Sequence, residues 1–240
     1  MPRKATRRSA RLPNVARVRH IRHSVSITSI AQETELEQRE AESMPKIFLT
    51  GKPGSGKSTV FRKTVEILKG RGFTVTGIAT PDVRDETGAR IGFDVVDLAS
   101  GARAVLSRVP ERGHSRSVGR VKHAGTSHPD GPARDGETAR PAGPRVGRYR
   151  VDISSFEEVA LPALASSDSD LVGIDEVGKM EFLSEEFVSL WEELLESDVN
   201  VLAVVGVSYL GRYAGKGEVI QVTPENRDAL PRLVAERFER

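Results

Sequence analysis

The sequence predicts an α/β domain in three layers, in which a mostly parallel sheet is covered on both faces by helices. Short apolar segments with strand character alternate along the chain with segments whose apolar residues recur at helical spacing. Several of the expected strands are apolar throughout, which is typical of strands buried on both faces of a parallel sheet. A glycine-rich loop, GKPGSGKST at 51–59, joins the first expected strand to the first expected helix.

The first part of the domain is predicted from its periodicity and its glycines. The expected elements are a strand at 47–50, a helix at 58–69, a strand at 73–79 and a hairpin built from 82–84 and 91–98 around the turn DETGAR. The inner face of the helix is expected to carry Val60, Phe61, Thr64, Val65 and Leu68. Gly70 and Gly72 are expected to end this helix, because glycine readily adopts the conformation found at helix C-termini.

The second part continues the alternation. The expected elements are a helix at 155–165, a strand at 171–175, a helix at 184–196, strands at 199–205 and 218–222, and a final helix. Ser155 and Glu158 have the spacing of a capping box. Thr223 is expected to cap the final helix, with Pro224 at its first position. The inner face of the helix at 184–196 is expected to pack in the core through Phe187, Leu190, Trp191, Leu194 and Leu195.

A basic extension, residues 1–43, precedes the domain. It carries nine Lys/Arg and five Glu, a net charge of +4, which leaves −2 for the remainder of the chain. Three interpretations stay open: an extended or misassigned start before Met44, a mitochondrial transit peptide, or a nucleic-acid-binding tail. We expect disorder here, because the extension has too little apolar surface to offset the entropy of ordering it.

An insertion at about 110–147 interrupts the domain, which otherwise spans 44–240. It is rich in Gly, Pro, Arg, Ser and His and has no periodicity, so we expect a disordered surface segment, with a mobile lid as the alternative. Its histidines, His114, His123 and His128, have irregular spacings in a flexible setting, which argues against a metal site.

Composition narrows the class of protein. The 240 residues include no cysteine, so disulfides and thiolate metal sites are excluded, and a reducing compartment fits. No apolar run approaches the roughly 18 residues that cross a bilayer, so we expect no membrane association. We expect a cytoplasmic monomer, or an organellar protein if the extension is a transit peptide.

The glycine-rich loop matches the pattern G-x-x-x-x-G-K-[ST] through Gly51, Gly56, Lys57 and Ser58. Glycines let backbone amides turn inward around a β-phosphate, and the following helix directs its positive end at the same anion. Lys57 is expected to reach the β- and γ-phosphates, and the Ser58 hydroxyl to bind Mg²⁺. Because the match lies between a strand and a helix, it predicts a nucleotide-binding loop.

A second motif, LVGIDEVGKME at 171–181, ends an apolar strand in two carboxylates. This is how a Walker B aspartate is presented, so Asp175 is expected to hold Mg²⁺ across from Ser58. Glu176 can then face the γ-phosphate, where a carboxylate accepts a proton from an attacking water. By itself the pair is equally typical of a surface strand end, and the upstream loop favours the functional interpretation.

Cationic candidates for stabilising the transferred phosphoryl group are Arg84, Arg148 and Arg227, with Lys179 as a further candidate in an assisting role. Any one of these side chains is more often a solvated surface charge. The sequence does not select among them.

Taken together, GKPGSGKST, DVRDETGARIGFDVVDL, VGRYRVDISSFEEVALPAL, IDEVGKMEF and VTPENRD resemble, in this order, the cancer-related nucleoside-triphosphatases. The resemblance covers about 45–240 apart from the insertion. It implies a Rossmann-like P-loop domain with a RecA-type core. It also implies a Mg²⁺-dependent hydrolase of ATP, GTP and other nucleoside triphosphates, with broad base tolerance.

The site residues that the resemblance implies fall in two segments. The nucleotide-binding positions are Gly51, Lys52, Pro53, Gly54, Ser55, Gly56, Lys57, Ser58, Thr59, Leu171, Val172, Gly173, Ile174, Asp175, Glu176, Val177 and Gly178. Within them, Lys57 and Glu176 are catalytic candidates and Ser58 and Asp175 are the metal ligands. Arg227, from the cationic candidates above, is the third catalytic candidate. The segment VSYLGRYAGKGE at 207–218 is less typical of the family, and contacts of Arg212 or Lys216 with nucleotide stay open.

Two other functions remain compatible with these residues. The first is a kinase for a small molecule or nucleic acid, in which the carboxylate activates a hydroxyl instead of water. The second is a nucleotide-gated module that binds nucleic acid through its basic extension, where eight Lys/Arg lie in the first 22 residues.

Overall fold

The computed structural model describes residues 44–110, 143–165 and 169–239. The predictions for residues 1–43 and for most of the insertion, including its three histidines, lie outside the described residues. The last five positions of the expected insertion, 143–147, are described and include a short strand, Arg145–Val146. Among the helices of these ranges, none is both long and apolar enough to span a membrane.

The described ranges contain ten strands and six helical segments. The strands are β1 (Lys46–Thr50), β2 (Val75–Ala79), β3 (Asp82–Arg84), β4 (Arg90–Asp97), β5 (Arg103–Arg108), β6 (Arg145–Val146), β7 (Tyr149–Val151), β8 (Leu171–Val177), β9 (Asn200–Val205) and β10 (Glu218–Gln221). The α-helices are α2 (Lys57–Gly70), α3 (Ile153–Leu164), α4 (Glu185–Glu196) and α5 (Leu230–Ala235), and the 3₁₀ segments are η1 (Glu181–Leu183) and η2 (Val207–Tyr213).

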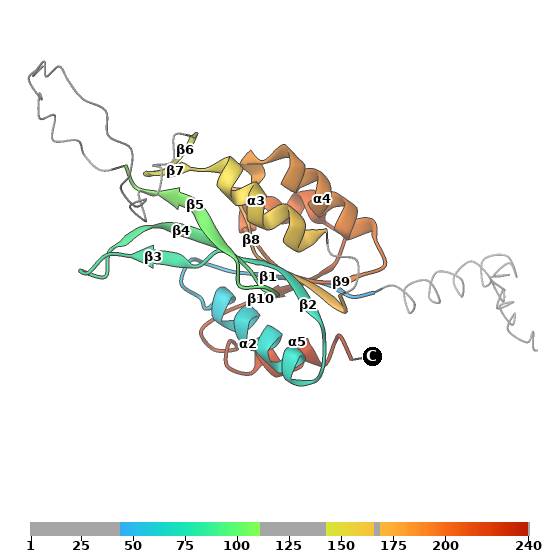
Figure 1. The fold of residues 1–240 in the computed structure, drawn as a ribbon. Helices are drawn as coiled ribbons and strands as arrows, with labels where there is room; N and C mark the ends of the chain where they lie inside the picture. Colours follow the sequence, from blue (N-terminus) through green and yellow to red (C-terminus); the bar gives the residue numbers. More distant parts are fainter. Residues whose placement is uncertain (1–43, 111–142, 166–168, 240) are drawn as a thin grey trace, which may run out of the picture. The chain divides into compact units, whose positions relative to one another are not determined.

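The strands form one mixed sheet in the order β10-β1-β9-β8-β2-β4-β5-β7-β6, with β3 paired to β4 (Figure 1). From β10 to β2 all neighbours are parallel. From β2 onward the neighbours are antiparallel, so β4, β5, β7 and β6 extend the parallel half as a meander. The carboxyl ends of β1, β8 and β9 meet at one edge of the parallel half, where ligands bind in open α/β sheets.

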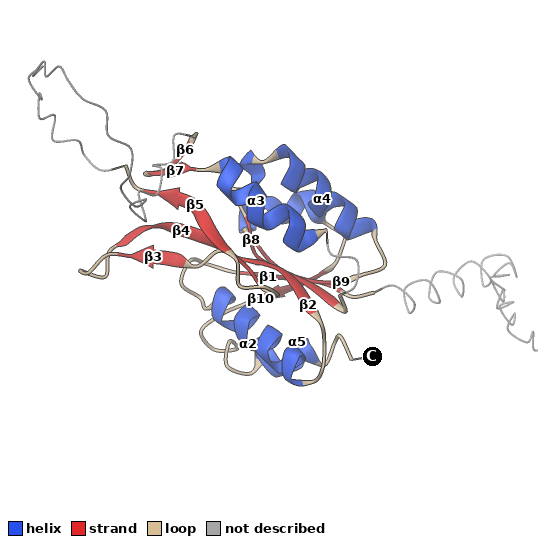
Figure 2. Ribbon diagram, viewed as in Figure 1, coloured by secondary structure: helices blue, strands red, loops and turns tan. Residues whose placement is uncertain are grey.

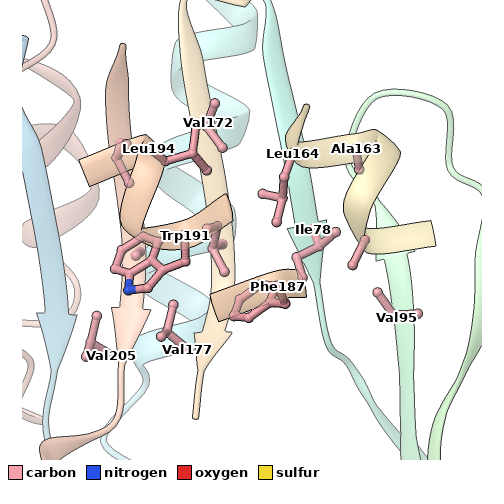
Figure 3. Packing of buried hydrophobic residues seen from close by; sticks show 14 of the residues in the cluster. Ile78, Val95, Ala163, Leu164, Val172, Val177, Phe187, Trp191, Leu194 and Val205 are labelled. Atoms are coloured by element: carbon pink, nitrogen blue, oxygen red, sulfur yellow. The ribbon is translucent and has the colours of Figure 1, made fainter. Parts of the chain in front are cut away.

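Helices cover both faces of the sheet, and this confirms the predicted three-layer class (Figure 2). The helices α2 and α5 pack on one face, over an apolar cluster that includes Phe61 and Leu68. On the other face α3 and α4 lie over a larger cluster, where Phe187 and Trp191 face strand residues such as Val177 (Figure 3). The five side chains predicted for the inner face of α2 are all buried.

The start of α3 differs from the prediction. Asp152, not Ser155, is the N-cap, and its carboxylate accepts a hydrogen bond of 3.1 Å from the Ser155 amide. The cap therefore lies three residues before the expected one, and the helix begins at Ile153. The capping interpretation of Ser155 and Glu158 was wrong, because an aspartate upstream offers a better acceptor for the amides of the first turn.

The last helix also begins later than predicted. Thr223 does not cap it, and residues 224–229 form turns ahead of α5. The Thr223 amide donates to Asn226 Oδ1 at 2.8 Å, and Asn226 Nδ2 donates to the Gln221 carbonyl at 2.9 Å. The asparagine side chain thus competes with helical backbone bonding and holds this segment as turns.

Two paired glycines bring α2 close to the sheet. Gly77 of β2 lies opposite Gly173 of β8, and a Cβ on Gly77 would stand only 2.0 Å from the Gly173 carbonyl oxygen. A Cβ on Gly173 would stand 3.0 Å from the ring of Phe61, a residue of α2. The ring therefore rests on bare backbone of β8, one turn along from the start of α2.

Candidate active site at the carboxyl edge of the parallel strands

The loop between β1 and α2 has the backbone that its glycines allow. Gly51, Gly54 and Gly56 have φ angles of 145°, 79° and 102°, which side-chain-bearing residues rarely adopt. A Cβ on Gly51 would also stand 2.5 Å from the Val222 carbonyl oxygen. Gly56 occupies the N-cap of α2 and has no side chain to cap it, so amides of the first turn remain free to bind an anion.

Lys57 closes over this loop. Its Nζ donates to the carbonyl oxygens of Gly51 and Lys52, both at 3.2 Å. The ammonium group therefore lies above the concave side of the loop, where a phosphate would sit. Lys52, Pro53 and Gly54 form the exposed outer turn of the loop, whereas Ser55 is buried beneath it.

Ser58 and Asp175 meet across the gap between α2 and β8. Ser58 Oγ donates to Asp175 Oδ1 at 3.2 Å. The Thr80 amide and hydroxyl, at 2.5 and 2.7 Å, both donate to the Asp175 carbonyl and hold the strand end in place. Asp175 is buried, with 8% of its surface exposed, and burial raises its pKa to about 7. The Ser58 hydrogen bond and the Lys57 charge act in the opposite direction, and the Glu176 charge adds to the increase.

Glu176 follows on the same strand and is half-buried. The peptide bond between Asp175 and Glu176 is cis. Burial raises the pKa of the Glu176 carboxyl, and the nearby charge of Lys57 lowers it. A Cβ built on Gly178 would stand 3.0 Å from Glu176 Oε1, so the carboxylate folds back beside the loop that follows β8. The structure thus brings Lys57, Ser58, Asp175 and Glu176 together at one edge.

Glu181 is a third carboxyl at this site, and the sequence motifs gave it no role. It lies at the start of η1, only 5% exposed, and its Oε2 accepts a hydrogen bond of 3.0 Å from the Gly178 amide. Burial raises its pKa to about 8, and the charges of Glu176 and Asp175 add to the increase. The available signal was the glutamate in GKMEF, an acidic residue directly before apolar residues that pack in the core.

Replacing Glu181 by glutamine is expected to reduce the pH dependence of stability. A buried carboxyl with a raised pKa favours the folded state below its unfolded pKa, and this contribution is lost as pH rises through the folded value near 8. The parent should therefore lose stability relative to Glu181→Gln between about pH 5 and pH 9, by on the order of 1.4 kcal/mol per unit of pKa shift. Urea unfolding of ligand-free protein across that range measures the difference. Parallel stability curves for the two proteins would contradict the expectation, and Glu186→Gln, on the exposed side of α4, is the matched control.

The residues at this edge fit a magnesium ion. Ser58 Oγ and Asp175 Oδ1 are hard oxygen ligands on opposite sides of a narrow gap. Mg²⁺ in phosphate-binding proteins takes one or two protein oxygens and completes its shell with water and phosphate oxygens. Deprotonated Asp175 is required for this, and the positive ion would itself favour that form.

The three arginine candidates differ in whether they lie near the phosphate-binding loop. Arg227 lies against the loop, because a Cβ on Gly56 would stand 3.0 Å from Arg227 Cδ. Arg84 pairs with Asp82 at 2.6 Å, and Arg148 bonds the Arg90 carbonyl and lies over the Tyr149 ring. Both belong to the antiparallel half of the sheet or its turns.

Arg212 and Lys216, whose contacts with nucleotide the sequence left open, both form ion pairs with glutamates of α4. Arg212 pairs with Glu192 at 2.6 Å, and Lys216 pairs with Glu196. These pairs join η2 and the residues that follow it to the exposed side of α4. Within the described residues, neither side chain forms a hydrogen bond or ion pair with the loop or with the two carboxylates of β8.

Most of the remaining predicted positions are buried residues of β8 that position the site and do not line it. Leu171, Val172, Gly173, Ile174 and Val177 are buried along β8. They pack in the two apolar clusters or beneath α2 and so fix where Asp175 and Glu176 emerge. Thr59 is exposed on the first turn of α2.

Comparisons with known proteins agree with this geometry. A protein-family model described as NTPase matches residues 46–127 and 133–235. The nucleoside-triphosphatase THEP1 of Methanosarcina barkeri is 39% identical over 201 residues, which cover 81% of this chain and 98% of that protein. The cancer-related nucleoside-triphosphatase homolog of Mus musculus is 36% identical over 205 residues, covering 79% and 94%.

A solved structure extends the comparison to the fold. The crystal structure of THEP1 from the hyperthermophile Aquifex aeolicus matches with a TM-score of 0.58 and 29% identity, and covers 81% of this chain and 99% of that one. The family model and the relatives confirm the resemblance inferred from the motifs, and the chain belongs to the NTPase family.

Proposed function

We propose that the chain is a Mg²⁺-dependent nucleoside-5′-triphosphate phosphohydrolase that converts ATP, GTP and other triphosphates to the diphosphate and phosphate. The observation that carries the proposal is the convergence of Ser58, Asp175 and Glu176 at the mouth of the phosphate-binding loop, with Ser58 Oγ 3.2 Å from Asp175 Oδ1. The names of the relatives, which are nucleoside-triphosphatases, support the same reaction.

Each residue has a part that its position supports. The loop amides and Lys57 bind the β- and γ-phosphates, and Ser58 and Asp175 hold the metal ion, which neutralises charge on the phosphate oxygens when bound. Glu176, in its ionised form, accepts a proton from the water that attacks the γ-phosphorus. The position of the Arg227 side chain beside Gly56 supports a role in stabilising charge on the transferring group.

Broad base specificity follows from what the site contacts. The loop and the carboxylates address the triphosphate, which all nucleotides share, and the proposed ligands come from 51–59 and the end of β8. The proposed nucleic-acid contact of the basic extension, the monomeric state and the compartment stay predictions of the sequence, as does the domain organisation.

The test is phosphate release from a panel of nucleoside tri- and diphosphates, with Mg²⁺ and with excess EDTA. We expect release from several triphosphates in Mg²⁺ and none in EDTA, and a reduced rate for Arg227→Ala relative to Arg232→Ala on α5. Release that required a single base would contradict broad specificity. An unchanged rate in Arg227→Ala would remove that arginine from the site.

A further inference from the structure

A cavity of about 300 Å³ opens beside Glu176, at the carboxyl end of β8. Its charged lining residues are Glu176, Lys179 and Glu181. Its walls come from six separated segments, the ends of β2, β8 and β9 and the strands β4, β5 and β6. None of residues 51–59 lines it, within the described part of the chain.

The walls are apolar and aromatic. They include Phe93 of β4, Leu106 of β5, Val146 of β6, Met180 after β8 and Tyr209 of η2. Water needs no such surface to attack a phosphate. Pockets that combine apolar walls with a few convergent polar groups are typical of binding sites for small organic molecules.

The nucleotide base does not account for this cavity. In the proposed function the loop binds the phosphate chain, so the terminal phosphate would point toward Asp175 and Glu176 and the base would lie at the opposite end of that chain. The cavity is lined by Glu176 and, among the residues that the structure describes, by none of 51–59. An occupant would therefore approach the γ-phosphate from the direction of the attacking group.

We propose that this cavity is a second-substrate site for a small neutral alcohol with a flat apolar or aromatic body, to which the chain transfers the γ-phosphoryl group of a nucleoside triphosphate. The inference rests on the proposed function, because the same loop and the same carboxylate serve both reactions. Hydrolysis is the outcome when water, not an alcohol, lies beside Glu176.

The chemical step balances without a further reactant. The acceptor hydroxyl oxygen forms a bond to the γ-phosphorus as the bond from that phosphorus to the β,γ-bridging oxygen breaks. The electrons of the broken bond leave with the nucleoside diphosphate, and the hydroxyl proton passes to the Glu176 carboxylate. The products are a phosphate monoester and the diphosphate.

The charges in the lining set the class of occupant. The Lys179 ammonium balances the Glu176 carboxylate, and Glu181 is mostly protonated at neutral pH, so the lining favours a neutral occupant whose hydroxyl can donate a hydrogen bond to Glu176. Thr80 and Ser208 add hydroxyl groups to the lining. The aromatic side chains of Phe93 and Tyr209 suit a flat apolar body.

The test uses the full chain with 3-pyridinemethanol and 2-phenylethanol as probes, and 3-methylpyridine as an analogue without the hydroxyl. Ligand-observed NMR measures binding, and ATP labelled in its γ-phosphate measures how the label divides between inorganic phosphate and ester. Val146→Trp and Ser208→Trp each fill the cavity from a different wall, so one remains informative if the other fails to fold. Leu233→Trp, at an exposed position of α5, is the control.

We expect the alcohols to bind and to divert label into an ester at least tenfold above the level given by 3-methylpyridine. Both cavity-filling variants should abolish binding and ester formation while phosphate release stays within about twofold of the parent. Binding without ester would overturn the transfer reaction. If the alcohols did not bind, or bound equally to both cavity-filling variants, while phosphate release stayed intact, the second site alone would be overturned. If the parent released no phosphate, the proposed hydrolase would be overturned.

Discussion

Replacing Glu176 by glutamine is expected to slow phosphate release by about 100-fold or more while nucleotide binding stays close to that of the parent. Glutamine has nearly the same shape but cannot accept a proton. The half-buried position of Glu176 beside Gly178 can hold the amide without rearrangement, and the phosphate-binding loop lies elsewhere in the chain. The loss should therefore fall on the rate of the bound complex.

Single-turnover phosphate release and the affinity for a non-hydrolysable triphosphate together measure the two effects. Glu186→Gln, an exposed glutamate near the start of α4, is the matched control and should behave like the parent. If Glu176→Gln turned over as fast as the parent, Glu176 would not be the base. The parent should also lose activity as pH falls through the raised pKa of Glu176, because only the ionised carboxylate accepts a proton.

Replacing Lys57 by alanine is expected to remove most nucleotide binding, and turnover with it. The ammonium group lies over the loop, 3.2 Å from two of its carbonyl oxygens, and a bound phosphate would receive these hydrogen bonds instead. Losing a charge-assisted contact to phosphate in this partly enclosed position should weaken affinity by on the order of 100-fold, about 2.7 kcal/mol.

Titration calorimetry with a non-hydrolysable triphosphate in Mg²⁺ measures this change. Lys52→Ala is the matched control, because Lys52 belongs to the same loop and is exposed. Equal loss in both variants would indicate a general effect of positive charge near the loop. Affinity retained in Lys57→Ala would remove this lysine from phosphate binding.

The elements that the sequence predicted are those fixed by local pattern. The helix α2 and the strands β1, β8 and β9 are predictable because their buried side chains repeat at regular spacing and glycines mark their ends. The two motifs that flank the site, at 51–59 and 171–181, lie on those elements. The sequence alone therefore suffices to predict that Lys57, Ser58, Asp175 and Glu176 lie at one edge of the sheet.

The antiparallel half of the sheet was much harder to predict from the sequence. The strand β5, RAVLSR, was not anticipated, since only two of its six residues are buried and arginines stand at both ends. Its identity depends on pairing with β4, which directly precedes it, and with β7, which is remote in sequence. Glu181 was missed for the same reason, because its burial arises from η1 folding back against Gly178 and not from any local pattern.

The helix N-caps were not predictable for a different reason. Asp152 and Ser155 both qualify as N-cap residues, and the sequence does not say which amide will reach which oxygen. At the last helix, Asn226 competes with a threonine cap through two hydrogen bonds that depend on the position of Gln221 at the end of β10. When two possible N-cap residues lie a few positions apart, the tertiary placement of the strands decides which of them caps the helix.

The absence of a side chain at Gly173 affects the proposed metal site as well as the packing of α2. Phe61 stands three residues after Ser58 on α2, and Gly173 stands two residues before Asp175 on β8, so one contact sets how far apart the two proposed metal ligands are carried. A methyl group at Gly173 would push the helix outward and widen that gap. Substitution at Gly173 is therefore expected to weaken the affinity for the ion, although Gly173 is not one of the proposed ligands. A higher Mg²⁺ concentration for half-maximal activity in such a variant would show that the distance between α2 and β8 controls metal binding.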